Sequence, residues 1–201
     1  MKYPIVFIIN GYPGSGKDTF VNMVTEYGVH YNKYEKFKGS LNQGYLTINS
    51  STVDIIKKVA KELGWNGEKT PEARKFLADL KKLSVDFNDF PNKKLISDIK
   101  AARNTKVVRA EDGYVFSKTF DSHFKFWFIH CREPEEIDKL KSQIGEDCFT
   151  IFVSREKHEG NLSNDSDKNV ENYNYDYYID NSRILEDLDE RVYLFLKHFD
   201  S

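Results

Sequence analysis

Cysteine is scarce in this sequence, and neither sign of charge is in clear excess. Cys131 and Cys148 are its only cysteines, and they show no metal-binding or redox spacing. The 201 residues include 30 lysines and arginines and 32 aspartates and glutamates, a formal net charge of −2. No overall field therefore selects nucleic acid or an anionic membrane as a partner. The first residues fit neither a cleavable signal nor a membrane-spanning helix, so we expect a cytoplasmic protein in a reducing compartment.

Histidine offers no metal site, and arginine is rare enough for each one to be informative. The five histidines have no paired ligand spacing, which argues against a structural metal, and neither cysteine has a partnered base that would make it a nucleophile. Arginine's rigid fork suits bidentate phosphate binding better than lysine does. The candidates for anion binding are therefore Arg74, Arg103, Arg109, Arg132, Arg155, Arg183 and Arg191.

Apolar runs and helical spacing alternate along the chain. Continuous apolar runs predict central strands over residues 3–9, 124–130, 148–154 and 175–181. Helical spacing predicts helices over residues 17–27, 52–63, 70–87, 91–102, 134–142 and 183–199. Residues 29–37 and 44–49 favour β structure and fit a hairpin or an extended second strand, whereas 104–125 has no assignment. We expect a single α/β domain whose parallel sheet is covered by helices on both faces.

One short segment carries a phosphate-binding pattern. The stretch "NGYPGSGKDTF", residues 10–20, fits the spacing G-x-x-x-x-G-K-[ST] up to its last position, where the chain has Asp18 and places Thr19 one residue later. It lies between a predicted strand and a predicted helix, as that motif requires. A tight strand-to-helix turn without a ligand is the alternative, and the spacing, the lysine and the context together disfavour it.

The residue types of this loop suit the chemistry of phosphate binding. Gly11, Gly14 and Gly16 allow backbone conformations and close approaches that a side chain would prevent. Successive backbone N–H groups, including that of Ser15, can then face phosphate oxygens beside a helix N-terminus. Lys17 can reach the β and γ phosphates of a nucleotide.

Asp18 and Thr19 each have two interpretations. A carboxylate in the first turn of a helix is favoured by the helix dipole, but Asp18 could also hold Mg²⁺ through water. The Thr19 hydroxyl could face the α phosphate or the metal, or bond to its own helix. The sequence leaves both pairs of alternatives open.

The motif and several later segments resemble a known family. "GYPGSGKDT" resembles the loop of P-loop nucleoside monophosphate kinases; adenylate kinases carry a similar "GxPGSGKGT". "SGKD" is similar to viral deoxynucleoside monophosphate kinases and to animal phosphomevalonate kinases. "SSTVDIIKKVAKELGW", "FIHCREPEEIDKLK" and "DYYIDNSRILEDL" resemble family segments in the same order, so the resemblance spans most of the chain, although only the loop is specific.

The resemblance implies a fold and a set of site residues. The fold would be a three-layer P-loop kinase fold in one domain, residues 1–201, with a five-stranded parallel sheet, a helical acceptor-binding arm (50–105) and a lid loop (154–174). Gly11, residues 14–19 and Asn181, the last of these near the adenine, would bind ATP. Arg132 would bind the acceptor's phosphate, and Arg155 would lie at the base of the lid. Arg74 is a further candidate for that phosphate because of its place in the arm.

The expected activity is ATP- and Mg²⁺-dependent phosphoryl transfer to a nucleoside or deoxynucleoside monophosphate, with Lys17, Arg132 and Arg155 as catalytic residues. Two alternatives stay open, namely a kinase of another phosphorylated metabolite, of the dephospho-coenzyme A or phosphomevalonate type, and a nucleotide-binding sensor without catalysis. The segment "IHCRE" departs from many P-loop enzymes because it lacks an acid that ends the strand. Glu133, Asp18 or another acid would then take the metal role. We expect small nucleotides as ligands, with no nucleic acid and no membrane partner.

Overall fold

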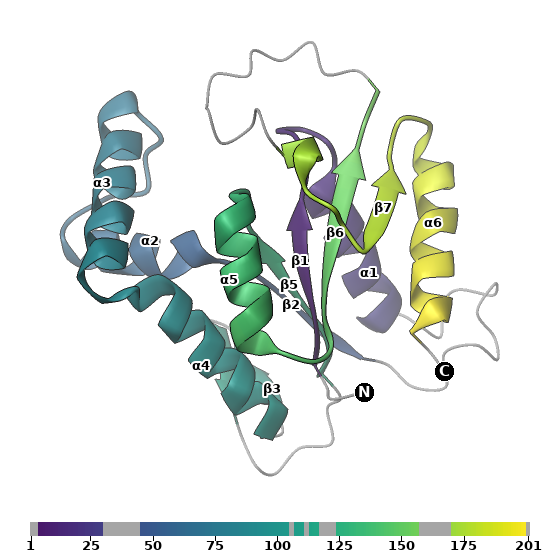
Figure 1. Cartoon of the computed structure of the whole chain (residues 1–201), viewed down its shortest axis with the longest axis horizontal. Coiled ribbons are helices and arrows are strands. Elements are labelled where there is room, and N and C mark those ends of the chain that lie inside the picture. Colours follow the sequence, from purple (N-terminus) through teal and green to yellow (C-terminus); the bar gives the residue numbers. More distant parts are fainter. Residues whose placement is uncertain are drawn as a thin grey trace.

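The main sheet of the protein has five parallel strands. The computed structural model describes residues 4–29, 45–104, 107–110, 113–116, 124–156 and 170–199. In the sheet the strands follow the order β2-β5-β1-β6-β7, and every neighbouring pair is parallel (Figure 1). Their bounds are β1 (Ile5–Asn10), β2 (Leu46–Ser51), β5 (Phe124–His130), β6 (Cys148–Ser154) and β7 (Tyr177–Asp180). The predicted five-stranded parallel sheet is therefore confirmed.

Helices lie on both faces of this sheet, as expected (Figure 1). They are α1 (Lys17–Val29), α2 (Thr52–Glu62), α3 (Pro71–Asn88), α4 (Phe90–Asn104), α5 (Pro134–Ile144) and α6 (Leu185–His198). On one face α1 packs against α6, and on the other α4 packs against α5. The described part of the chain is thus a three-layer α/β arrangement, which is consistent with a P-loop kinase fold.

The position of β1 in the middle of the sheet explains why its residues 5–9 are all apolar. All six residues of β1 are buried, and neighbouring side chains point to opposite faces of the sheet. Phe7 belongs to the core shared with α1 and α6, whereas Val6 and Ile8 belong to the core shared with α4 and α5. A strand covered on both sides has no solvent-facing position, so its apolar run is continuous rather than alternating.

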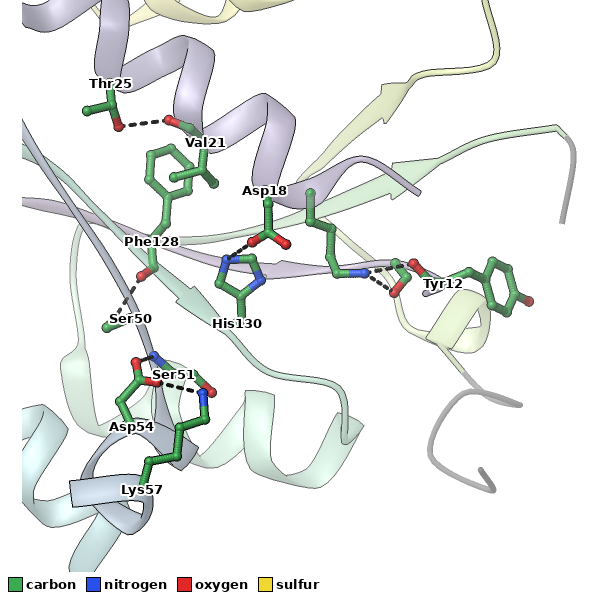
Figure 2. Close-up of polar contacts among 12 residues, drawn as sticks. Tyr12, Asp18, Val21, Thr25, Ser50, Ser51, Asp54, Lys57, Phe128 and His130 are labelled. Atoms are coloured by element: carbon green, nitrogen blue, oxygen red, sulfur yellow. Dashed lines mark hydrogen bonds and ion pairs between the residues drawn. The ribbon is translucent and has the colours of Figure 1, made fainter. Parts of the chain in front are cut away.

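The helices between β2 and β5 begin at well-defined capping residues. Ser51 and Asp54 form a capping box at the start of α2 (Figure 2), and Thr70 caps α3, whose first residue is Pro71. Asp89, in the left-handed conformation (φ 57°), ends α3. Helix α3 lies at the edge of the molecule and has no buried residue, whereas one face of α4 is buried against the rest of the protein. The expected arm therefore contains three helices, and α4 is also part of the core.

Several boundaries differ from expectation, and some predictions cannot be compared. Strand β7 begins at Tyr177 rather than at residue 175. In the unassigned region 104–125, β3 (Val107–Ala110) and β4 (Gly113–Phe116) form an antiparallel pair. A short 3-10 helix, η4 (Val170–Asn172), precedes β7. Residues 30–44, within the expected hairpin, and 157–169, within the expected lid, lie outside the described residues. Among the described helices, none is both long and apolar enough to cross a membrane.

Candidate functional site

The loop between β1 and α1 has the backbone conformation that its glycines allow. Gly11, Gly14 and Gly16 have φ values of 145°, 76° and 95°, in the region that favours glycine. A Cβ atom on Gly11 would lie 2.2 Å from the Val153 carbonyl oxygen, and one on Gly16 would lie 2.1 Å from Asn181 Nδ2. The order of strand, glycine turn and helix is therefore present. At Gly11 and Gly16 the neighbouring atoms also leave no room for a side chain.

Lys17 lies against the loop that precedes it. Its Nζ donates to the carbonyl oxygens of Gly11 (2.6 Å) and Tyr12 (2.7 Å). The ammonium group is therefore held beside the loop backbone rather than directed into bulk solvent. A phosphate in the loop could accept hydrogen bonds from the same group, because ammonium protons turn readily toward a stronger acceptor.

Asn181 is hydrogen-bonded to the loop. Its Nδ2 donates to the Ser15 carbonyl oxygen at 2.9 Å, and its backbone N–H donates to the Ser154 carbonyl oxygen at 2.7 Å. The residue after β7 thereby anchors the loop to the end of β6. Its expected place near an adenine stays a prediction, whereas its bond to the loop was not expected from sequence.

Asn10, the last residue of β1, is fully buried and anchors the other end of the loop. Its Oδ1 accepts from the Gly11 N–H at 2.8 Å, and its Nδ2 donates to the Arg132 carbonyl oxygen at 3.0 Å and to the Tyr175 hydroxyl at 2.8 Å. Sequence reasoning overlooked this residue. The signal was an amide at the end of an otherwise apolar buried strand, since a buried polar group needs partners.

Asp18 and His130 face each other at the mouth of the loop (Figure 2). Asp18 Oδ1 lies 3.5 Å from His130 Nε2, and the Asp18 side chain is 84% exposed. Burial lowers the pKa of His130 below its ordinary value, although the Asp18 carboxylate opposes this shift. The imidazole is therefore neutral at neutral pH. Asp18 lies in the first turn of α1, where the helix dipole favours a carboxylate, and its exposed side chain could also hold Mg²⁺ through water. Both interpretations therefore stay open.

A cleft of about 720 Å³ joins the loop to the end of β5 and to the helices α2 and α3. Five of the residues predicted for the site line this cleft together: Gly14, Lys17, Asp18, Arg74 and Arg132. Parallel strands bring their carboxyl ends to one edge of the sheet, so the β1 loop meets the residues that follow β5. Arg74, which had no motif of its own, thus faces the same cavity as Arg132.

The cleft is rich in cations. Besides Lys17, Arg74 and Arg132 it is lined by Lys57 and Lys81, against the three carboxylates of Asp18, Glu133 and Glu136. Lys81 pairs with Glu136 at 3.1 Å, and Lys57 pairs with Asp54 at 3.3 Å. Within the described residues the exposed Arg74 makes no side-chain hydrogen bond or ion pair. Sequence reasoning did not find the two lysines, since lysine-rich helices usually signal only a solvated face.

Two other predicted residues are placed elsewhere. Arg155 follows β6 and is exposed, and Thr19 is exposed in the first turn of α1; neither lines the cleft. Arg155 lies two residues before the part of the expected lid that is outside the described residues. The predicted roles of these two residues stay predictions.

The carboxylates in the cleft fit a hydrated magnesium ion better than a dehydrated metal centre. Within the described ranges no group of three or more histidine, cysteine or acidic side chains could enclose a metal. Mg²⁺ is usually held by one or two carboxylates together with water and substrate phosphates. Asp18 and Glu133 both line the cleft and are the candidates to hold such an ion, with Thr19 beside Asp18 in sequence.

Comparison with protein-family models and with curated proteins finds no match for this chain. The loop, the cleft and the resemblance of the motifs are therefore what indicates a function.

Proposed function

We propose that this protein is an ATP-dependent kinase that transfers a phosphoryl group to a small phosphorylated acceptor, foremost a nucleoside or deoxynucleoside monophosphate. The observation that carries the proposal is the cleft that brings Lys17 of the loop together with Arg74 and Arg132. A phosphate on the loop and a second phosphate between the arginines would share one cavity. That arrangement suits a donor and an acceptor better than a single ligand.

The chemistry of phosphoryl transfer needs positions and charges more than it needs reactive side chains. Charge spreads over the transferred group, so cations and N–H groups aimed at it supply most of the catalysis. In this proposal the loop N–H groups and Lys17 bind the donor phosphates, and Arg155 adds charge there. Arg132 and Arg74 hold the acceptor phosphate in line. Asp18, Thr19 and Glu133 would hold Mg²⁺ through water, and the ion would neutralise phosphate charge.

A second acceptor class has one observation in its favour. The described residues that line the cleft include no phenylalanine, tyrosine or tryptophan on which a base could stack, but five cations. This composition suits an acceptor with a further anionic group, such as another phosphorylated metabolite. The two proposals share the loop and the transfer step and differ only in the acceptor.

An acceptor screen tests both proposals. Purified protein is mixed with Mg²⁺ and ATP, and ADP formation is followed with a panel of ribo- and deoxynucleoside monophosphates and a matched panel of phosphorylated, non-nucleotide acids. Lys17→Ala and a reaction without acceptor are the controls. Turnover of a monophosphate supports the first proposal, and turnover restricted to the acids supports the second. If ATP binds but no acceptor is phosphorylated, the kinase proposal is wrong and a nucleotide sensor is the better explanation.

A further inference from the structure

Three segments that carry the proposed site meet at one buried side chain. Asn10 is 0% exposed, and its amide group bonds at once to the start of the loop, to the backbone of Arg132 and to Tyr175. Arg132 is 122 residues away in sequence and Tyr175 is 165 residues away. These bonds use both N–H groups of the amide and one lone pair of its oxygen.

Tyr175 extends this network to the segment before β7. Its hydroxyl accepts from Asn10 Nδ2 and donates to the Val170 carbonyl oxygen at 2.6 Å, and the side chain is 4% exposed. Its ring packs beside Phe152 of β6, with centroids 5.1 Å apart. Burial raises the pKa of Tyr175, so its hydroxyl keeps the proton that it donates.

A second contact joins the same two regions. The Tyr12 hydroxyl in the loop is hydrogen-bonded to Glu171, and the pKa of Tyr12 is raised to about 12, first by burial and then by this carboxylate. The segment 170–175 therefore contacts the loop at Tyr12 and the end of β1 at Asn10. Only the Asn10–Tyr175 contact also includes the backbone of Arg132.

We propose that Asn10 and Tyr175 are positioning residues that fix the donor-phosphate loop and the acceptor-phosphate arginine relative to each other. The inference rests on the proposed function, because it assigns Lys17 to the donor and Arg132 to the acceptor. Asn10 Oδ1 holds the loop, while the Tyr175 hydroxyl orients the amide whose other N–H holds the Arg132 carbonyl. Neither side chain lies on the reacting atoms. Their effect is geometric, and transfer reactions are sensitive to shifts of about 1 Å.

The test is Tyr175→Phe, which removes one hydroxyl and keeps the ring in its cluster. The loop keeps its bonds to Asn10 Oδ1 and to Asn181, so the Kd of an ATP analogue should change by less than about twofold, whereas misplacement of Arg132 should lower kcat about tenfold and raise the acceptor KM about fivefold. Tyr173→Phe is the matched control. The hydroxyl of Tyr173 bonds to Asp138 at the surface, and its ring belongs to the same cluster, 5.0 Å from that of Tyr175.

Amide hydrogen exchange provides a readout that needs no turnover. In Tyr175→Phe, exchange should rise about tenfold in residues 131–133 and 170–172 and stay unchanged in α6, whereas Tyr173→Phe should resemble the wild-type protein. The proposal is overturned if both variants behave alike in kinetics and exchange, or if Tyr175→Phe weakens ATP binding as much as transfer. If the wild-type protein transfers no phosphoryl group, the proposed function fails. The exchange comparison then decides separately whether Tyr175 holds the Arg132 backbone.

Discussion

Gly16 and Gly64 have nearly the same φ angle and very different surroundings. Their φ values are 95° and 96°. A Cβ atom on Gly16 would lie 2.1 Å from Asn181 Nδ2, whereas one on Gly64 would have no atom within 4 Å. A side chain at Gly64 would therefore cause backbone strain alone. A side chain at Gly16 would cause the same strain and would also displace Asn181.

We expect Gly16→Ala to weaken ATP binding at least tenfold, because the new methyl group displaces Asn181 from the Ser15 carbonyl oxygen. Gly64→Ala should leave ATP binding unchanged and lower the free energy of unfolding by about 1–2 kcal/mol through strain. Gly16→Ala should lower it by a further ~1 kcal/mol for the lost hydrogen bond. Isothermal calorimetry and urea unfolding measure both quantities. Equal ATP affinity in the two variants would contradict the role given to Gly16.

Arg132 should contribute to acceptor binding without contributing to ATP binding. Its backbone is held by Asn10, so truncation of the side chain leaves the loop contacts in place. We expect Arg132→Ala to raise the acceptor KM about 10- to 100-fold, as the loss of a charge-assisted hydrogen bond would, with the Kd for ATP within about twofold. Arg183→Ala, an exposed arginine away from the cleft, is the control. A parallel loss of ATP affinity in Arg132→Ala would argue against separate donor and acceptor subsites.

Among the helices, α4 is joined to the body by the hydrogen bonds of one arginine as well as by its buried apolar side chains. Arg103 lies in the last turn of α4 and donates to the carbonyl oxygens of Ile144 (3.0 Å) and Glu146 (3.0 Å). Ile144 is the last residue of α5, where carbonyl groups lack helical partners. The guanidinium at the end of α4 therefore donates to carbonyl groups at the end of α5, which have no helical partner. It also donates to the Pro4 carbonyl oxygen at 3.5 Å.

We expect Arg103→Ala to lower the free energy of unfolding by about 2 kcal/mol, because the carbonyl groups at the end of α5 lose charge-assisted hydrogen bonds. Arg103→Lys should lose part of this, since an ammonium group cannot reproduce the planar fork. ATP binding should not change, because the loop lies at the opposite end of β1. Urea unfolding followed by circular dichroism provides the measurement. A loss below about 0.5 kcal/mol, the usual size for a surface change, would show that water replaces these bonds.

Asp176 joins three parts of the whole molecule and gives its stability a pH dependence. Its Oδ2 accepts from the Thr150 N–H (2.8 Å), from the Thr150 hydroxyl (2.9 Å) and from Lys141 Nζ (2.7 Å). Desolvation opposes ionisation of this carboxyl, but the bonds from Lys141 and Thr150 outweigh it and hold the pKa of Asp176 below its ordinary value. The charged form is therefore favoured in the folded state.

A group whose pKa is lowered by folding stabilises the protein above its unfolded pKa and loses this effect as the pH falls through the folded value. We expect the stability difference between wild type and Asp176→Asn to be constant above about pH 5 and to shrink below about pH 4. Urea unfolding across pH 3–7 measures it. Asp79→Asn, at an exposed carboxylate bonded to Lys75, is the control and should show little difference at any pH. If the stability difference between wild type and Asp176→Asn grew as the pH fell, the pKa of Asp176 would not be lowered by folding.

Local chemistry explains which parts of the fold could be predicted. The apolar run before Gly11, the caps at Ser51 and Thr70, and the helical spacing after Pro134 each act within a few residues, so the sequence pattern alone located these elements. The pair β3–β4 was overlooked although Asp112-Gly113 is a hairpin signal. Strand β7 starts later than expected because the backbone N–H groups of Tyr175 and Asp176 donate to the side-chain hydroxyls of Tyr178 and Thr150 rather than to the backbone of β6.

The sequence by itself determined the loop and its glycines, four of the five strands of the main sheet and the helices, because turn chemistry and periodic burial are local properties. Only the tertiary structure decided that Arg74 shares a cleft with Arg132, and that Asn10 joins the loop to Arg132 and Tyr175. These contacts depend on strand order, register and helix packing. Strand order, register and helix packing are determined by the burial of whole faces of sheets and helices. They cannot be predicted from a short stretch of residues.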